Sequence, residues 1–388
     1  NRSLDQERDL TYAQFQSEDA FGLFDTSTTS ISLHRQAEER DRIKSNGSQQ
    51  FQGFEVNTLG MFQHFSKQSA LGHWTMGADF YLDSVSSFLD KGSSQTAADD
   101  IQGPVADDAS YLTSGIFVQD QIALSERMNL SLGMRLAHAR VDANEVRDPV
   151  TNTQISIKDD WTAVLGSARV NYALPGESAT LCGGISQGFR APNLSDLTRF
   201  DSSRSDEFEI PAPGLDPENS MSFELGIKHE SKRSSAQAAL FYTDIADGIV
   251  RVPTGNTNAD GDAEITKANV GDGHIFGIEL SGVLALADDF QIFGNLTWME
   301  GKQNTYPTSA PVVVEENIDR LMPLTLMAGT RWDAPASSLW IEFLIRAAAK
   351  ADRLNTRDEA DDTRIPDGGT PAYITAQLST GYQLSDDL

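Results

Sequence analysis

The chain has 388 residues, of which 39% are hydrophobic, and its formal net charge is −27. This length allows two or three ordinary domains or one large barrel, and the acidity disfavours a nucleic-acid partner, because phosphate binding needs clustered Lys and Arg. No segment approaches the roughly 20 consecutive apolar residues of a membrane-spanning helix, so a helical membrane protein is excluded.

The chain starts with residues 1–10, which contain neither the basic segment nor the apolar segment of a secretory signal. It is therefore either a cytosolic protein or a mature or truncated chain. The single cysteine, Cys182, excludes an intrachain disulfide and a metal cluster built on cysteines. We expect this thiol to behave as a small apolar side chain.

Apolar and polar residues alternate strictly in the stretches 128–136, 223–228, 276–284 and 341–346. In the first of these, Met and Leu occupy the even positions, and Asn, Ser, Gly and Arg lie between them. A period of two predicts β-strands with one apolar and one polar face.

Short turn signals recur near residues 22, 68, 125, 175, 233, 288, 336 and 385. Each interval holds two long alternating stretches joined by a long acidic connection, at 88–109, 145–158, 190–216, 252–268, 301–318 and 350–370. A propeller blade would fit four short strands into this length, which disfavours a propeller.

Short turns at one end and long loops at the other are typical of a transmembrane antiparallel β-barrel of the outer-membrane type, with about 15 strands here. The apolar strand face would meet lipid, and the polar face would line the lumen. Because such barrels have an even number of strands, we interpret the chain as a piece that lacks strands at both ends. The alternative is a large soluble antiparallel β protein, whose apolar faces would pack against a second layer.

One stretch carries a family resemblance. A strand end carries the motif GFRAP, formed by Gly188, Phe189, Arg190, Ala191 and Pro192. The motifs P-x-L-x-P-E and E-x-G follow, formed by Pro213, Leu215, Pro217, Glu218, Glu224 and Gly226, with Ala212 where Asn is usual. This pattern resembles the C-terminal barrel of TonB-dependent outer-membrane receptors. Residues 114–135, 240–252 and 269–282 resemble further strands of that barrel, in the same order.

The resemblance implies an all-β barrel of 22 strands, of which residues 1–388 are a fragment without the N-terminal plug and the last strands. It implies a receptor in the outer membrane of a Gram-negative bacterium that takes up a scarce large nutrient, most often a ferric siderophore. Its partners would be lipid, lipopolysaccharide and, through the plug, the periplasmic TonB complex. No catalysis and no cofactor are implied. The alternatives are a receptor for cobalamin or an oligosaccharide, a passive porin, and a secreted soluble β protein or adhesin.

The loop 190–216 is the candidate for ligand capture, because loops on a rigid scaffold commonly carry recognition. Its candidate residues are Arg199, Arg204, Asp206, Glu207 and Phe208. The alternative is a solvated cover that makes no specific ligand contact. No histidine lies between Phe189 and Leu215. Since haem-uptake members of the family carry one there, the sequence disfavours haem.

Residues 184–188 fit G-x-S-x-G, the nucleophile elbow of serine hydrolases. That elbow requires a helix directly after the serine, and Pro192 would break it. We therefore expect Ser186 to line the lumen on a strand, without a catalytic role.

A weaker motif is a partial calcium loop with candidate ligands at Asn256, Asn258, Asp260 and Asp262. Lys267 stands where the bidentate Glu is required, so a solvated turn is favoured and no metal is expected. The six histidines show no metal-ligand spacing. Trp74, Trp298, Trp332 and Trp340 are expected in an interfacial aromatic belt.

Overall fold

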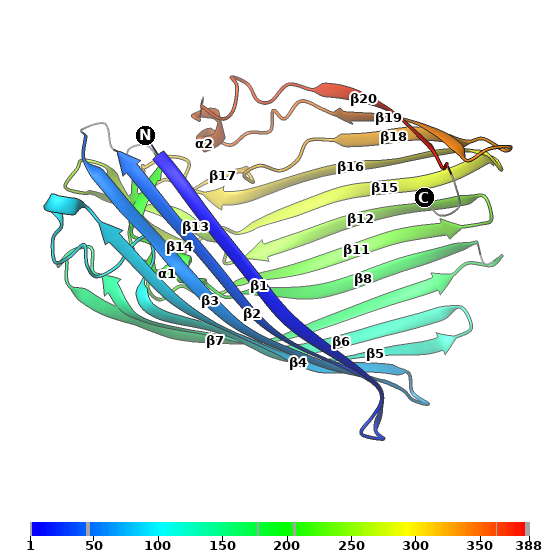
Figure 1. The fold of residues 1–388 in the computed structure, drawn as a ribbon, viewed down its shortest axis with the longest axis horizontal. Helices are drawn as coiled ribbons and strands as arrows, with labels where there is room; N and C mark the ends of the chain where they lie inside the picture. Colours follow the sequence, from blue (N-terminus) through cyan, green and yellow to red (C-terminus); the bar gives the residue numbers. More distant parts are fainter. Residues whose placement is uncertain (1, 44–46, 177, 205–206, 362, 385–388) are drawn as a thin grey trace.

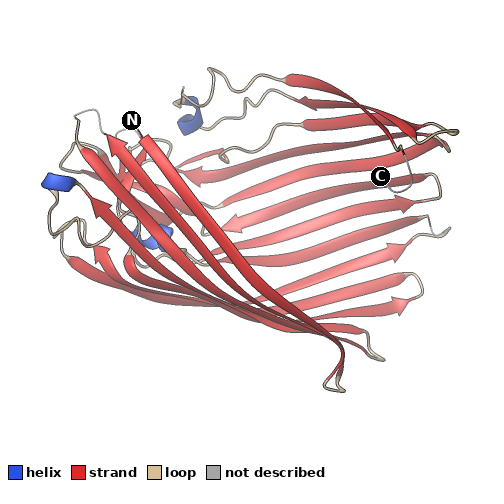
Figure 2. Cartoon of the chain, in the orientation of Figure 1, coloured by secondary structure: helices blue, strands red, loops and turns tan. Residues whose placement is uncertain are grey.

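The computed structural model describes residues 2–43, 47–176, 178–204, 207–361 and 363–384, and most of them lie in strands (Figure 2). Sixteen strands form one sheet, and each hydrogen-bonds its neighbours antiparallel. No helix in these ranges is long and apolar enough to cross a membrane.

The sheet forms the wall of the molecule (Figure 1). Fifteen strands follow one another in the order β1 to β8, β11, β12, β15, β16, β18, β19 and β20, and β17 extends the pairing of β16. The wall strands are β1 (Arg2–Ala20), β2 (Phe24–Ile43), β3 (Gln49–Gln68), β4 (His73–Asp90), β5 (Asp107–Ser125), β6 (Met128–Arg147), β7 (Gln154–Ala173), β8 (Ala179–Arg190), β11 (Glu218–Glu230), β12 (Ser234–Ala246), β15 (Gly273–Ala287), β16 (Phe290–Thr305), β17 (Val314–Asn317), β18 (Thr325–Asp333), β19 (Leu339–Ala348) and β20 (Tyr373–Tyr382). The predicted number and direction of the strands are confirmed.

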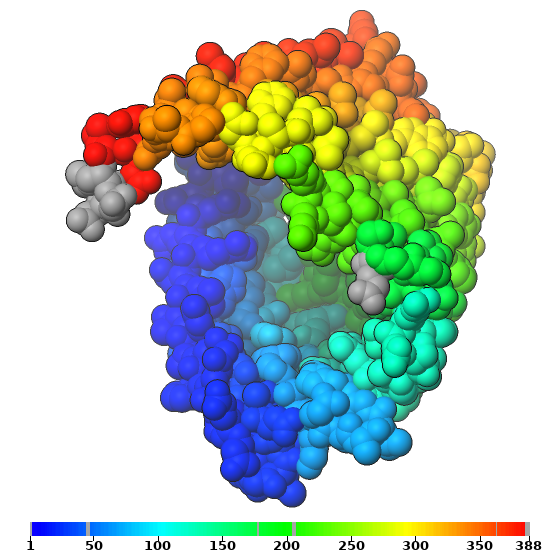
Figure 3. Space-filling model, turned by 90° about the vertical axis from the view of Figure 1, so that its right-hand side faces the viewer, coloured from blue at the N-terminus to red at the C-terminus, as the bar shows by residue number. Residues whose placement is uncertain are grey.

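The wall curves around a hollow, which is visible from the short-turn end (Figure 3). β1 and β20 are the two ends of the strand order, and within the described residues they are not paired with each other. Figure 3 accordingly shows a gap between the blue N-terminal strands and the red C-terminal strands.

The two faces of the wall differ as the alternation predicts. On β6 the side chains of Leu132, Met134 and Leu136 are exposed on one face, and Arg135 on the other face reaches Asp79 of β4 at 2.6 Å. A broad exposed apolar surface is unfavourable in water and favourable in lipid. The apolar face is therefore the outer face, and the ion pair lies on the face that lines the hollow.

Short turns join the strands at one end, for example at residues 21–23, 126–127, 231–233 and 288–289. Longer connections lie at the other end, at 91–106, 191–217, 247–272, 306–324 and 349–372. One expected connection, 145–158, is wrong in its bounds, because β6 runs to Arg147 and β7 starts at Gln154. Only residues 148–153 connect them, and the Asp148 carboxylate closes this turn by accepting from the Val150 and Thr151 amides at 2.8 Å.

The polar composition of 145–158 reflects strands that extend beyond the membrane. β1 to β7 have 18 to 20 residues each, whereas about 9–11 suffice to cross the hydrocarbon layer. About half of each strand therefore projects past the lipid, where polar side chains are favoured on both faces. A polar stretch alone does not distinguish such a projection from a loop.

The long connections contain regular structure. The segment 191–217 holds α1 (Leu194–Thr198), β9 (Asp201–Arg204) and β10 (Glu207–Glu209), and the segment 247–272 holds β13 (Ile249–Thr257) and β14 (Ala263–Asn269). These strands make a second sheet in the order β13-β14-β10-β9, in which β10 and β14 are parallel. Two further short helices are η1 (Gly92–Ser94) and α2 (Thr356–Glu359). All lie at the long-loop end (Figure 1).

The main apolar core lies under these loops, on the inner side of the wall. Ala139, Val141 and Ala143 of β6 are buried on the face that also carries Arg135, and they belong to one cluster with Leu197 of α1 and Leu215. The inner face was expected to be polar, and this prediction is wrong at the loop end. The reason is that the loops fold back onto the wall, so their contact surface excludes water and favours apolar side chains.

Candidate functional site

Three connections, at residues 91–106, 191–217 and 249–269, pack together at the long-loop end, and we call them the loop assembly. Four of its carboxylates, those of Asp99, Asp196, Asp201 and Glu209, are buried. A buried charge is tolerated when it is paired, and each of these four has a cationic partner. Asp99, Asp196 and Asp201 are hydrogen-bonded to theirs, whereas the Glu209 oxygens make charge contacts without a hydrogen bond. The ion pairs therefore decide how the loops are held.

Asp196 joins the wall to the second sheet. Its side chain caps α1 in a capping box with Asn193. One carboxylate oxygen accepts from Arg190 Nη1 at 2.7 Å, and the other accepts from Lys267 Nζ at 2.8 Å. Burial by itself would raise the pKa of Asp196, but the hydrogen bonds and charges of Lys267 and Arg190 outweigh it, so the pKa lies below its ordinary value.

Glu209 holds the second sheet together. Its side chain is 1% exposed. Its carboxylate lies 3.4 Å from Arg199 Nε, 3.4 Å from Arg251 Nε and 3.3 Å from Lys267 Nζ. Since these cations come from the loop before β9, from β13 and from β14, one carboxylate ties three segments to β10.

Asp201 and Asp99 fix the assembly to the wall. Asp201 Oδ2 accepts from Arg40 Nη2 of β2 at 2.8 Å. Asp99 accepts from Lys91 Nζ at 2.6 Å and from Arg147 Nη1 of β6 at 3.1 Å. Burial by itself would raise the pKa of Asp99. The hydrogen bonds from Lys91 and Thr96 outweigh this effect, so the pKa of Asp99 also lies below its ordinary value.

Most of the predicted ligand residues that the structure describes are internal contacts of this assembly. Arg199 faces Glu209, and the Phe208 ring packs edge-on against Phe200 with centroids 4.8 Å apart. Glu207 pairs with Arg204 in the β9–β10 ladder. Asp206 lies outside the described residues. Arg199, Glu207 and Phe208 thus contribute to the packing of the loop, and their contact with a ligand stays a prediction.

The residues of the family pattern also have structural roles. A Cβ at Gly188 would collide with Ser220 Oγ, Phe189 and Ala191 pack against the core, and Leu215 belongs to it. The Pro192 carbonyl accepts from Tyr111 Oη at 2.9 Å. The Pro217 carbonyl accepts from Asn219 Nδ2 at 3.3 Å. The neighbouring Glu218 faces Arg190 across the β8–β11 ladder.

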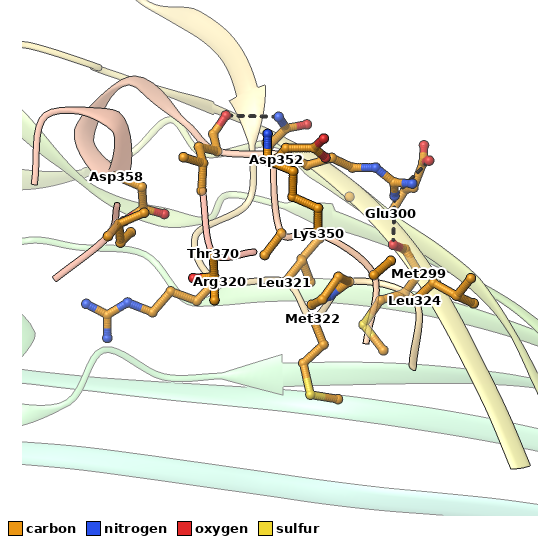
Figure 4. Close-up of a pocket in the computed structure, with 18 of the residues that line it drawn as sticks. Met299, Glu300, Arg320, Leu321, Met322, Leu324, Lys350, Asp352, Asp358 and Thr370 are labelled. Atoms are coloured by element: carbon orange, nitrogen blue, oxygen red, sulfur yellow. Dashed lines mark hydrogen bonds and ion pairs between the residues drawn. The ribbon is translucent and has the colours of Figure 1, made fainter. Parts of the chain in front are cut away.

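A cavity of about 450 Å³ lies beside the loop assembly, between β16 and the connections 306–324 and 349–372 (Figure 4). It exists because the wall is interrupted there. β16 pairs with β18 as far as Thr297 and with β17 from Lys302 onward. Between these two positions, the edge of β16 that faces β17 and β18 has no strand partner in the ladder. The Ile318 amide still donates to the Gly301 carbonyl of β16 at 3.1 Å. Beyond it the chain leaves β16, and residues 320–324 line the cavity.

Arg353 bridges the interruption. Its Nη1 donates to the Met299 carbonyl at 3.2 Å and lies 2.8 Å from the Glu300 carboxylate. Its guanidinium also lies 5.8 Å from the centroid of the Trp298 ring. A rigid planar cation with several donors is suited to this task, because it satisfies a strand carbonyl and a carboxylate together.

The cavity combines an apolar side with a charged side. Met299, Met322 and Leu324 lie together on one side, and Lys350 and Asp352 lie on the opposite side (Figure 4). Arg320 also lines it and extends away from the other side chains drawn (Figure 4). Such a mixture of apolar surface and a few charged groups is typical of ligand pockets. Sequence reasoning missed this site, although the apolar stretch 321–324 within a long acidic connection was a usable signal.

The other sequence motifs have simple explanations. Ser186 lies within β8, paired with Ser222 and Ser167, and lines a hollow of the wall with Arg169 and Glu224. The strand-to-helix turn of a hydrolase elbow is absent there, since α1 starts only at Leu194.

The partial calcium loop is a tight turn closed by its own side chain. Asn258 Oδ1 accepts from the Asp260 and Asp262 amides at 2.9 Å each, and Asn256 donates through its amide to Thr254 Oγ1 at 3.1 Å. In the described ranges no group of three or more His, Cys, Asp and Glu side chains is placed to hold a metal ion.

The tryptophans lie on both faces. Trp298 pairs with Ile278, and Trp332 pairs with Phe290, on the outer face. Trp74 is on the outer face as well, because it pairs with Asp120, and Asp120 pairs with Leu132, whose side chain points outward. Trp340 faces the hollow instead, with the Arg331 guanidinium 4.6 Å from its ring centroid, so it is not part of an outer belt.

Comparison with known proteins adds a family match. The family model described as "TonB dependent receptor-like, beta-barrel" matches residues 2–388. A curated relative, the iron-regulated outer membrane virulence protein of Vibrio cholerae, is 25% identical over 197 residues, which are 49% of this chain and 27% of that protein.

Solved structures share the fold. The copper transporter OprC superposes with a TM-score of 0.77 at 16% identity, covering 99% of this chain and 59% of that one. The hemophore receptor HasR of Serratia marcescens superposes with a TM-score of 0.74 at 14% identity, covering 98% of this chain and 61% of that one. The ferric enterobactin receptor PfeA of Pseudomonas aeruginosa superposes with a TM-score of 0.70 at 19% identity, covering 98% of this chain and 55% of that one. The chain thus spans a little over half the length of these structures.

Proposed function

The chain belongs to the family of TonB-dependent receptor β-barrels of the outer membrane, and from this premise we propose that it forms the wall and the ligand-capturing loops of a receptor for a ferric siderophore. Ferric catecholates, a major class of such ligands, are large anionic chelates. The observation that carries the proposal is the cavity of about 450 Å³ at the loop end, where Lys350 and Arg320 lie beside the apolar Met299 and Met322 in a lining that also holds Glu300, Asp352, Asp358 and Asp361.

The loop assembly supports the proposal in a second way. Its buried ion pairs hold one side of the loop end in a fixed shape, whereas the cavity is formed by the remaining connections, where Lys350 and Arg320 are exposed. A fixed scaffold beside accessible cations is suited to capturing an anion from a dilute solution, because charge complementarity accelerates encounter. The iron-regulated relative is consistent with iron as the nutrient.

We further propose that residues 1–388 are the larger part of a barrel that additional strands close. The outer edges of β1 and β20 are unpaired within the described chain. Unsatisfied strand edges are strongly unfavourable in lipid, which is why membrane barrels close. A plug that fills the hollow, energised through the periplasmic TonB complex, would complete the transporter, and lipopolysaccharide would surround its outward side.

A binding titration tests the function. We would measure quenching of tryptophan fluorescence in the detergent-solubilised protein from outer membranes, with ferric enterobactin as ligand and cobalamin and an oligosaccharide as competitors. The double variant Lys350→Gln with Arg320→Gln should lower affinity roughly tenfold, because two charge-assisted contacts contribute about 1 kcal/mol or less each at an exposed site. Lys302→Gln, outside the cavity on the same strand as Met299, is the matched control.

Unchanged affinity in the double variant would reject the cavity as the site of capture. Tight binding of cobalamin or the oligosaccharide with no binding of the ferric chelate would reject the siderophore. A passive porin would instead give steady ion conductance in planar bilayers with no saturable ligand binding.

A further inference from the structure

The two faces of the β1–β2 pair carry opposite charge at the loop end of the wall. Arg40 of β2 donates to Asp201 of the loop assembly at 2.8 Å, so its side chain lies on the inner face. Residues two apart along a strand share a face, and so do residues directly opposite each other in the ladder. The inner face therefore carries three further cations, Arg2, Arg8 and Arg42, and we call these three the arginine face.

The outer face of the same stretch is acidic. Asp5 lies directly opposite Glu39, and like charges in this position repel. Arg35 lies on this face but is already occupied, because its Nη1 lies 2.8 Å from Glu7 and its Nη2 lies 2.7 Å from Glu55. Two further carboxylates of this face are those of Asp9 and Asp41. The wall thus changes from negative on its outer side to positive on its inner side.

Arg2 and Arg42 lie directly opposite each other across the ladder. Two like charges in this position are destabilising, and the neighbour of Arg42 on β3 is the neutral Gln50. Among the residues that the structure describes, no carboxylate forms an ion pair with Arg2 or Arg42. The nearby Asp201 is taken by Arg40. A bound anion would therefore relieve the repulsion between the two guanidinium groups.

Arg8 is also left without a counter-charge. Its Nη2 donates to the amide oxygen of Gln36 at 3.1 Å, which is a neutral partner. Glu38, the carboxylate of this face that lies diagonal to Arg8 in the ladder, accepts instead from Gln6 Nε2 at 2.6 Å. Within the described chain Arg8 makes no ion pair, and its side chain is exposed.

The arginine face lies where a ligand enters. β1 starts and β2 ends at the long-loop end (Figure 1), the end that also holds the cavity. In a chain of net charge −27, these cations are available to an approaching anion, while the outer side of the same strands repels it. Strands added at the free edge of β1 would not change this orientation, because the pleat of β1 and its pairing with β2 fix it.

We propose that the arginine face is the first binding site of an anionic ligand and accelerates its entry into the hollow. A surface lined by one sign of charge raises the local concentration of the opposite ion and its association rate. Guanidinium groups can also bind carboxylate, phosphate or catecholate oxygens in pairs. The inference rests on the proposed function in one respect, the negative charge of the ligand, since a neutral nutrient would gain nothing from these cations.

Charged thiol reagents measure this field without any nutrient, in the protein purified from outer membranes. In a Cys182→Ser background, the substitution Leu4→Cys puts a thiol on the inner face, opposite Arg40, and Ser3→Cys puts one on the outer face. Each is treated with the anionic sulfonatoethyl methanethiosulfonate and with the cationic trimethylammonioethyl methanethiosulfonate. The ratio of the two rates cancels the reactivity of the thiolate, which both reagents share. We expect the anionic-to-cationic ratio to be roughly tenfold higher on the inner face.

Removing the arginines checks the origin of that difference. The triple variant Arg2→Gln with Arg8→Gln and Arg42→Gln should remove most of it, and so should salt at about 0.5 M, which screens exposed charges. Equal ratios at the two thiols before the arginines are removed would overturn the proposal, and this is the result expected if another segment of the protein already neutralises them. A difference that survives in the triple variant would overturn it as well.

Stopped-flow fluorescence with ferric enterobactin measures ligand entry. At low salt the triple variant should lower the association rate constant roughly tenfold and change the dissociation rate less than about twofold, because charge complementarity acts mainly on association. The control variant Arg127→Gln with Lys232→Gln and Arg233→Gln removes the same charge at the short-turn end and should associate as the wild type does. Equal slowing by both triple variants would assign the effect to net charge and overturn the proposal. If ferric enterobactin does not bind at all, the siderophore is rejected, whereas the reagent ratios still decide the arginine face.

Discussion

Arg190 and Glu218 face each other across the β8–β11 ladder, and Arg190 Nη2 donates to Glu218 Oε1 at 2.6 Å. These residues end one strand and begin the next, so their pair closes the base of the whole connection 191–217. Arg190 also donates to Asp196 of α1, and Glu218 Oε1 accepts from the Ile249 amide of β13 at 2.7 Å. The family pattern therefore marks a structural clamp for two loops.

Breaking the clamp should loosen the loops while the wall stays folded. Glu218→Gln removes the charge that pairs with Arg190, and we expect faster amide exchange in α1 and β13 by about tenfold, since a partly exposed charged pair contributes roughly 1–2 kcal/mol. Hydrogen exchange with mass spectrometry measures this. The control is Glu224→Gln, on the same strand as Glu218, which disrupts the exposed ion pair of Glu224 with Arg169. It should leave the amide exchange of α1 and β13 unchanged. Equally faster exchange in both variants would contradict the clamp.

Acid should open the loop assembly. The pKa of Asp196 and that of Asp99 lie below the ordinary value of 3.8, so the folded state binds fewer protons than the unfolded loops near that pH. The stabilisation is therefore complete above about pH 4 to 5 and is lost as pH falls through the lowered pKa values. Limited proteolysis with pepsin at pH 4 and pH 2 should cleave segments 91–106 and 191–217 only at the lower value.

A variant checks the origin of this acid response. Asp196→Asn removes one of the two carboxylates. Pepsin should then cleave the loop 191–217 at pH 4 as well, and the extent of cleavage should change little between pH 4 and pH 2. If wild type and variant have the same pH profile in this loop, protonation of Asp196 is not the cause.

Removing the charge of Glu209 should loosen the second sheet and separate β13 and β14 from β10. Glu209→Gln leaves Arg199, Arg251 and Lys267 near a neutral group. Since Arg199 and Arg251 are 31% and 29% exposed and Lys267 keeps its pair with Asp196, we expect a cost of about 1–3 kcal/mol. We expect protease cleavage within β13 and β14 under conditions where the wild type resists. Glu264→Gln, on β14 with its carboxylate bonded to Thr254, is the control and should remain resistant.

The assignment of the outer face can be tested with an introduced charge. Leu225 of β11 is exposed to lipid, and Leu225→Arg should destabilise the barrel by about 2–4 kcal/mol, the cost of a cation near the bilayer midplane. Ser222→Arg, on the opposite face of the same strand, should have an effect below about 1 kcal/mol, because a lumen position remains hydrated. Urea unfolding in lipid vesicles gives both values, and a larger cost for Ser222→Arg would invert the assignment.

The strands and their two faces were determined by the sequence itself. Alternation is a local property, because successive side chains of a strand point to opposite sides whatever else the chain does. The stretches 128–136, 223–228, 276–284 and 341–346 accordingly lie in β6, β11, β15 and β19. The position of Ser186 within a strand followed from the same alternation and from Pro192.

The contacts among loops were decided only by the tertiary structure. Lys267 and Asp196 are 71 positions apart, and Arg199 and Phe208 resemble free recognition groups until the fold places Glu209 and Phe200 against them. The cavity likewise depends on where β16 leaves its ladder and on Arg353 reaching it from another connection. Local patterns record only the periodicity of each segment, whereas long-range ion pairs depend on which segments the curvature of the wall brings together.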